Sequence, residues 1–333
     1  MTADTSASAY SERLPWHERQ WREIRTKIER GVLPHAMLLR GAEGLGKLAF
    51  ARYLAASLLC SDNTPDGASC GHCRSCTLIQ AGNHPDLIHV TVAPDKKSIG
   101  IDQIRELIDQ LALTPQYATG KIVIIAPAEG LNHNSANSLL KTLEEPPTGA
   151  HLLLCCSRPA NLPATIRSRC QQLVFQTPTL EEARDWLGRR LPEGENPEVL
   201  LQLAANAPFT ALHFSEIGLP EMRERLFRDF EGVVSGQGNP SDISEQWLKL
   251  GLNESLYCLY SWTVDMIRLA LSGESASVAN PEIRLRLHRL AGLSDKRRLF
   301  RRLDKTGDLL NRLDQSLNPQ LMLEELLIDW SIK

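Results

Sequence analysis

The sequence predicts an α/β domain with a parallel five-stranded sheet, followed by a small helical domain and a helical C-terminal domain. In the first half of the chain, short apolar runs alternate with helical stretches, as in a parallel sheet covered on both sides. After Thr177-Pro178-Thr179 the strand signals end and helical periodicity continues. We therefore expect domains at residues 1–176, 177–217 and 218–333.

The five expected strands are apolar runs bounded by turn residues, and they fall at residues 35–40, 86–91, 121–126, 151–156 and 172–176. A helix is expected before the first strand. It begins at Pro15, because proline is favoured in the first turn of a helix. The helices expected between the strands are 48–59, 101–113 and 135–145. The last of these ends at Pro146-Pro147, since proline cannot continue a helix.

The rest of the chain predicts helices only. Three of them, at 180–191, 197–205 and 208–215, form the small domain, which ends near Gly218-Leu219-Pro220. The C-terminal domain is expected to contain helices at 221–234, 243–252, 254–272, 281–292, 295–314 and 319–331. Leucines recur at helical spacing in this region. This pattern favours a buried core over an oligomer interface.

Composition excludes some classes of protein. The chain has 333 residues, with 37 Lys and Arg against 40 Asp and Glu, so it is not held on nucleic acid mainly by global positive charge. No apolar run approaches the ~18–20 residues of a membrane span. The first eleven residues lack the apolar segment of a signal peptide. We expect a soluble cytoplasmic protein.

Four of the eight cysteines, Cys60, Cys70, Cys73 and Cys76, lie close together in the sequence. Two tandem Cys-x-x-Cys steps and a cysteine at a helix end suit tetrahedral Zn²⁺, with no ligand position left open, so the site is expected to be structural. An iron–sulfur cluster and a chance spacing are the alternatives. The neighbouring His72 and His84 are expected at the surface. Core positions are expected for Cys155, Cys156, Cys170 and Cys258.

Gly41-Ala-Glu-Gly44-Leu-Gly46-Lys47 follows a strand and opens a helix, which is the context of a phosphate-binding loop, or P-loop. Its glycines let backbone N–H groups approach a phosphate, and Lys47 can reach the β and γ oxygens. The next residue should be Ser or Thr to hold Mg²⁺, but it is Leu48. The third strand should end in Asp, but it ends in Ala126-Pro127, and Glu129 lies beyond it. The loop therefore predicts the fold of a P-loop domain. The missing Mg²⁺ ligands predict that the chain does not hydrolyse ATP.

The order of these features resembles bacterial clamp-loader subunits of the AAA+ class. The specific motifs are the cysteine insertion after the P-loop helix, the run Asn137 to Pro147 (Asn-Ser-Leu-Leu-Lys-Thr-Leu-Glu-Glu-Pro-Pro), and Ser168-Arg169-Cys170. The resemblance covers nearly the whole chain, including 318–327, which is similar to the last helix of the collar. It implies an AAA+ domain with a zinc module at 60–76, a lid domain and a collar domain.

The resemblance also implies roles for single residues. Active members carry Thr after the P-loop Lys and Asp-Glu on the third strand, so this chain looks like a non-catalytic member. Its Gly41, Gly44, Gly46 and Lys47 would then be a vestigial nucleotide site. Arg169 would reach across a subunit interface to a neighbour's ATP, where an arginine neutralises charge on the γ-phosphate. Phe209 stands where active members carry an arginine that contacts the nucleotide.

The partners implied are the ATPase subunits gamma/tau and the clamp-opening subunit delta, in a hetero-pentamer within DNA polymerase III. That assembly holds the sliding clamp and primer–template DNA, with contacts to phosphates and no sequence specificity. The chain would not be an enzyme by itself. It would have structural zinc, no functional ATP/Mg²⁺ site and no membrane association.

Two other functions remain open on the sequence. One is an active clamp-loader ATPase with an atypical third-strand motif. The other is a zinc-module DNA-binding protein that borrows the fold, although a lone DNA binder has no use for an arginine that acts in trans. The basic residues Lys96-Lys97 and those from Arg284 to Lys305 are compatible with phosphate contacts or with solvated and subunit-facing surfaces.

Overall fold

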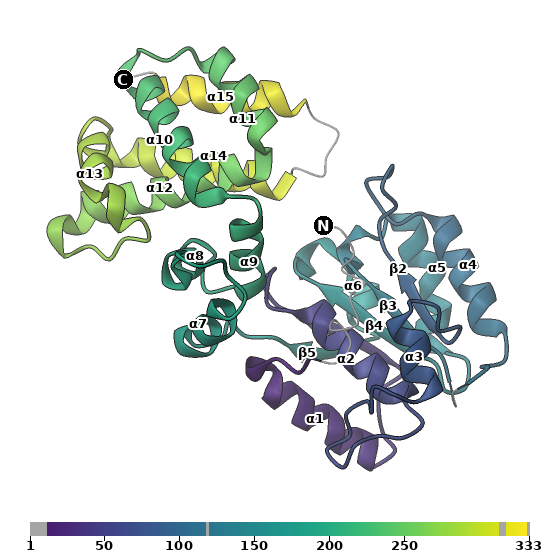
Figure 1. Ribbon diagram of the computed structural model, residues 1–333. Coiled ribbons are helices and arrows are strands. Elements are labelled where there is room, and N and C mark those ends of the chain that lie inside the picture. Colours follow the sequence, from purple (N-terminus) through teal and green to yellow (C-terminus); the bar gives the residue numbers. More distant parts are fainter. Residues whose placement is uncertain (1–11, 118–119, 313–317, 332–333) are drawn as a thin grey trace. The chain divides into compact units, whose positions relative to one another are not determined.

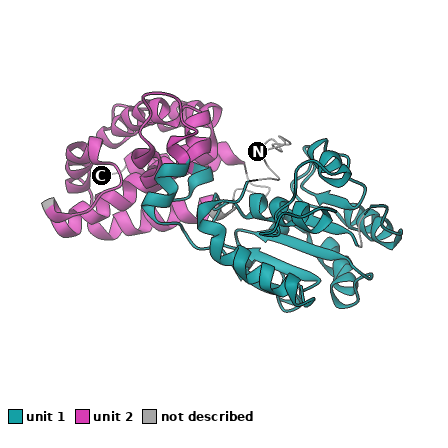
Figure 2. Cartoon of the chain, turned by 60° about the horizontal axis from the view of Figure 1, so that its bottom comes forward, with its two compact units in different colours: residues 1–186, 206–210 teal, residues 187–205, 211–333 magenta. Residues whose placement is uncertain are grey.

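The computed structural model describes residues 12–117, 120–312 and 318–331 (Figure 1). The chain separates into two compact units (Figure 2). Unit 1 is Met1–Trp186 with Asn206–Thr210, and unit 2 is Leu187–Ala205 with Ala211–Lys333. Among the described residues, no helix is both long and apolar enough to cross a membrane.

Unit 1 contains a sheet of five parallel strands in the order β2-β3-β4-β1-β5. The central pair is in register with Leu38 beside Leu154. The predicted parallel five-stranded sheet is thus confirmed. The strands are β1 (Ala36–Arg40), β2 (Leu87–Val90), β3 (Ile122–Ile125), β4 (His151–Cys156) and β5 (Gln171–Val174).

Helices cover both faces of this sheet (Figure 1). Alternate residues of a strand point to opposite faces, so Leu39 packs with α1 and α2, whereas Leu38 packs with α4 and α5. Crossover helices of this kind are required because parallel strands cannot be joined by tight turns. The helices of unit 1 are α1 (Glu18–Glu29), α2 (Lys47–Leu59), α3 (Arg74–Gln80), α4 (Ile101–Ala112), α5 (His133–Glu144) and α6 (Ala164–Arg167).

No strand follows β5 in the described part of the chain, as the sequence predicts. Asn196 and Asn239 cap α8 and α11 through side-chain oxygens, each with proline in the first turn. The segment after β5 forms α7 (Leu180–Gly188), α8 (Pro197–Leu203), α9 (Pro208–Glu216), α10 (Leu219–Ser235), α11 (Pro240–Leu250), α12 (Leu252–Ser272), α13 (Arg284–Gly292), α14 (Lys296–Arg312) and α15 (Pro319–Ser331).

Unit 2 has an aromatic core. The ring centroid of Phe230 lies 5.8 Å from that of Trp262 and 4.9 Å from that of Trp330. Part of the basic segment packs on this core, because Arg302 lies over the Trp330 ring and pairs with Asp329. Arg286 pairs with Glu224 and Glu231. These arginines are therefore structural parts of unit 2.

Candidate functional site

The P-loop joins β1 to α2. Gly46 precedes α2 with a φ of 83°, a left-handed conformation that glycine adopts without strain. The Lys47 ammonium is buried and donates to two carbonyl oxygens of its own loop, Gly41 at 2.9 Å and Ala42 at 2.6 Å. Burial lowers the pKa of Lys47. The predicted residues are thus brought together, but the lysine is held by its own loop.

Residues from both ends of unit 1 cover this loop. Trp16 Nε1 and His17 Nε2 donate to the Leu45 carbonyl, at 3.0 and 2.8 Å. Burial lowers the pKa of His17 to about 4, so its ring is neutral near pH 7. A Cβ atom placed on Gly46 would lie only 2.6 Å from a methyl of Leu14. Leu14, Trp16 and His17 therefore lie directly against Leu45 and Gly46 of the loop.

Phe209 completes the cover. Its backbone N–H donates to the Gly44 carbonyl at 3.0 Å, and a Cβ placed on Gly46 would lie 2.8 Å from the Phe209 ring. The rings of Trp16 and Trp186 lie 5.4 Å apart, and those of Trp186 and Phe209 lie 4.8 Å apart. An aromatic ring therefore lies beside the P-loop and offers no charge to a phosphate.

The positions expected to hold Mg²⁺ offer no oxygen ligand from a side chain. Leu48 packs against the core between the sheet and α2. Ala126 and Pro127 follow β3, and the next carboxylate, that of Glu129, is engaged elsewhere. Its Oε1 accepts from the backbone N–H groups of Ser157, at 2.9 Å, and Arg158, at 3.1 Å. Glu129 thereby ties the end of β3 to the end of β4.

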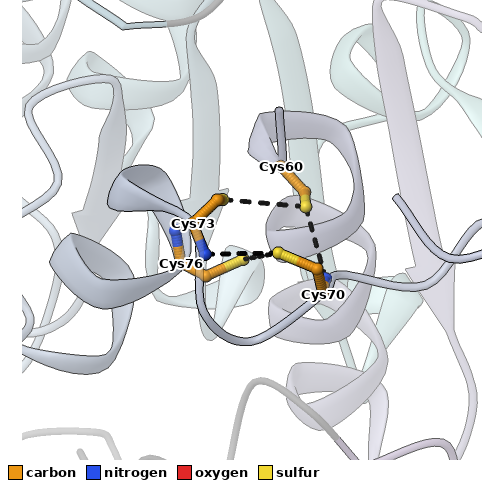
Figure 3. Close-up of side chains that lie close together, drawn as sticks. All are labelled: Cys60, Cys70, Cys73 and Cys76. Atoms are coloured by element: carbon orange, nitrogen blue, oxygen red, sulfur yellow. Dashed lines mark hydrogen bonds between the residues drawn. The ribbon is translucent and has the colours of Figure 1, made fainter. Parts of the chain in front are cut away.

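The four clustered cysteines converge (Figure 3). Cys60 follows α2, Cys73 precedes α3, and Cys76 lies in its first turn. The Sγ atoms of Cys60 and Cys73 are 3.9 Å apart, those of Cys70 and Cys76 are 4.0 Å apart, and all four lie within 4.8 Å of one another. A tetrahedron with Zn–S bonds of ~2.3 Å has edges of about 3.8 Å. The four sulfurs could therefore hold a metal ion.

Backbone N–H groups orient these sulfurs. Cys70 N–H donates to Cys60 Sγ at 3.3 Å, and Cys73 N–H donates to Cys70 Sγ at 3.3 Å. Burial would raise the pKa of Cys73, but hydrogen bonds from Ser61 and Cys76 outweigh it and lower that pKa to about 5. Burial raises the pKa of Cys60 and of Cys76. A bound cation would offset this cost and keep the sulfurs as thiolates.

His84 is buried, so the expectation that it lies at the surface is wrong; His72 is exposed as expected. The N–H of Asp86 donates to His84 Nδ1 at 3.1 Å, so the ring proton is on Nε2. Nε2 lies 2.7 Å from Ser75 Oγ, which donates to the Leu59 carbonyl at 2.6 Å. Burial lowers the pKa of His84, which favours this neutral form. No periodic pattern in the sequence predicts this chain of hydrogen bonds, because it joins α3 to the end of α2.

We expect His84→Ala to loosen the segment around the cysteines, because Ser75 and the Asp86 N–H each lose a buried partner. The cost of such a loss is about 1–3 kcal/mol. Hydrogen exchange of the α3 amides measures it as faster local opening. His72→Ala is the matched control and should leave exchange unchanged. Equal protection in both variants would contradict the bridging role of His84.

Arg169 lies just after α6 on the surface of unit 1. Its Nε donates to Glu144 Oε1 at 2.7 Å, and one terminal nitrogen donates to the Thr165 carbonyl at 3.0 Å. The side chains of Arg169 and Glu144 are 33% and 50% exposed, so the pair can be broken from solvent. The next residue, Cys170, is buried, as are Cys155, Cys156 and Cys258, which confirms the expected core cysteines. The described contacts of Arg169 include no P-loop residue.

Known proteins share both halves of this chain. The family described as "DNA polymerase III, delta subunit" matches residues 16–179, and its C-terminal counterpart matches 218–331. DNA polymerase III subunit delta′ of Pseudomonas aeruginosa is 32% identical over 323 residues, which are 95% of this chain and 97% of that protein. The chain belongs to the delta-prime family of DNA polymerase III subunits. The family resemblance inferred from the motifs is thus confirmed at the level of bacterial DNA polymerase III delta-prime subunits.

Other known proteins are also similar to this chain. The delta′ subunit of Escherichia coli is 35% identical over 216 residues, which are 64% of each chain. The tau subunit of the same organism is 34% identical over 214 residues, 63% of this chain and 31% of tau. A solved gamma-subunit-related protein of Thermotoga maritima aligns over 94% of this chain and 98% of its own, with 19% identity and a TM-score of 0.43.

Proposed function

We propose that this delta-prime chain is a non-catalytic subunit of the DNA polymerase III clamp loader, which helps to load the sliding clamp onto primed DNA. The observation that carries this proposal is a P-loop whose Lys47 is bound by its own carbonyls and whose Gly46 lies against Phe209, together with an arginine that remains at the surface. The chain does not turn over ATP itself. It supplies Arg169 to the ATP site of a neighbouring subunit.

The P-loop supports the proposal that this chain does not turn over ATP. A triphosphate on this loop would have to displace the carbonyl partners of Lys47 and move the Phe209 ring. It would also bind without a side-chain ligand for Mg²⁺, because Leu48 and Ala126-Pro127 stand at the ligand positions. Each defect weakens binding or hydrolysis independently, so their combination favours a subunit without a nucleotide cycle.

The sizes of the two interactions of Arg169 support the proposal that it acts at the ATP site of a neighbouring subunit. An exposed ion pair such as Arg169–Glu144 contributes about 0–1 kcal/mol. An arginine donated in trans to a γ-phosphate is worth roughly 10³–10⁵ in rate. The interaction with a neighbour's nucleotide therefore outweighs the internal pair, and buried Cys170 anchors the backbone from which Arg169 extends.

Cys60, Cys70, Cys73 and Cys76 hold a structural zinc ion that stabilises the connection between α2 and α3. The ATPase subunits gamma/tau and the subunit delta complete a hetero-pentamer that encloses primer–template DNA. Residues 177–217 act as the lid and residues 218–333 as the collar through which the subunits associate. Family membership and the similarity to tau support these partners.

We expect Lys47→Ala in this subunit to leave the DNA-stimulated ATPase of the assembled loader nearly unchanged, because the hydrogen bonds described for this lysine go to carbonyls of its own loop. The isolated wild-type chain should hydrolyse no ATP above background. The matched control is the same change in the P-loop of a gamma/tau subunit, which should abolish turnover at that site. Loss of turnover with Lys47→Ala would instead support an active ATPase with an atypical third-strand motif.

A further inference from the structure

A pocket of about 280 Å³ opens in unit 1. It lies between the ends of β1 and β5 and the short helix α6. Two arginines, a serine and a glutamine line it together with apolar side chains, namely Arg40, Arg167, Ser168, Gln172, Leu38 and Pro159. None of these residues belongs to the P-loop, the cysteine cluster or the Arg169–Glu144 pair.

Both arginines of this pocket have an Nε atom without a hydrogen-bond partner among the described residues. The Nε atoms of Arg40 and Arg167 are buried, and neither finds a hydrogen-bond acceptor among the described residues. No ion pair joins either guanidinium to a described carboxylate, whereas Arg105 of the same unit pairs with Asp102. A buried donor without an acceptor is costly, so the site favours an external acceptor.

The surrounding sequence makes this site electropositive. From Pro146 to Leu180 the chain contains no Asp or Glu, but it carries Arg158, Arg167 and Arg169. Glu144 and Glu145 precede this stretch, and Glu144 is engaged by Arg169, whereas Glu129 accepts from the backbone N–H groups of Ser157 and Arg158. Two guanidinium groups match a group with about two negative charges and several acceptor oxygens, as a phosphate has. A single carboxylate would neutralise only one of them.

We propose that this pocket binds a phosphate group, with Arg40 and Arg167 as the charged donors. The serine hydroxyl and the glutamine amide are the further polar groups of the wall. The phosphate is carried either by a nucleotide or by the backbone of DNA, since both present the same group. This site is independent of the action of Arg169 in trans, because that residue does not line the pocket.

The test is a titration of the full-length, zinc-loaded chain with inorganic phosphate, followed by NMR of the arginine Nε–H groups. Saturable shifts of the Arg40 and Arg167 signals are expected. Arg167→Gln and Arg40→Gln should each raise the dissociation constant about tenfold or more, because each removes a charge-assisted bond. Arg105→Gln removes an equal charge outside the pocket and should leave binding unchanged.

Further experiments identify the molecule that carries the phosphate. Competition by primer–template DNA or by ATP without Mg²⁺ supports the pocket and names its carrier. Arg169→Ala should keep the phosphate titration intact even if it lowers loader activity, which separates this proposal from the proposed function. Should Arg167→Gln fail to fold, Arg167→Lys replaces it, with weaker binding expected because the fork geometry is lost.

Three outcomes would overturn the proposal. The first is the absence of saturable shifts on the two Nε signals. The second is equal weakening by Arg105→Gln, which would indicate diffuse electrostatics. The third is acetate binding as tightly as phosphate, which would indicate a pocket for a partner protein's carboxylate.

Discussion

Replacing Arg169 by Ala is expected to lower clamp loading and the DNA-stimulated ATPase of the assembled loader, while the isolated chain keeps its fold and its metal. The physical reason is the loss of charge neutralisation at a neighbour's γ-phosphate, worth roughly 10³–10⁵ in rate at that site. Because a loader contains several ATP sites, the total turnover should fall only by the share of this site and of any site coupled to it. Reconstitution with wild-type partners measures the effect.

Two further variants separate the finger from a surface residue. Arg169→Lys should restore little activity, because an ammonium cannot reproduce the planar fork. Glu144→Gln removes the internal partner of Arg169 and should preserve activity, since an exposed pair contributes about 0–1 kcal/mol. Full loader activity with Ala at position 169 would show that the arginine does not act in trans.

Removing the metal is expected to unfold the segment from Cys60 to Cys76 locally. Structural zinc is worth about 10–16 kcal/mol in zinc-finger peptides, so the loop between α2 and α3 should lose most of its stability with a chelator. Metal analysis should find about one zinc per chain, as a four-thiolate site requires. Hydrogen exchange should accelerate in α3 and remain unchanged in α12 of unit 2.

The matched control for this prediction is Cys258→Ala, which removes a buried cysteine of unit 2 and should leave the metal content at its wild-type value. Cys73→Ser should lower it, because one sulfur of the four is lost. Protein purified without chelators that contains no metal, and whose four clustered thiols all react freely, would refute the zinc site.

Most of the fold follows from local sequence patterns. The strands were predictable because each is a short apolar run, and the longer helices because their apolar residues recur at helical spacing. The helices α3 and α6 were not predicted, since each is too short to show a full period. The cysteine cluster and the P-loop were found in the sequence because their residues are close along the chain.

The sequence by itself determined the strands and the longer helices, the absence of side-chain Mg²⁺ ligands at Leu48 and Ala126-Pro127, and the spacing of the cysteines. Only the tertiary structure decided that the Phe209 ring lies against Gly46 of the P-loop and that Arg169 donates a hydrogen bond to Glu144. It alone placed Arg40 and Arg167 in one pocket. The physical reason is that these contacts join residues far apart in the chain. They arise from the strand order of the sheet and the return of residues 206–210 to unit 1, which periodicity does not encode.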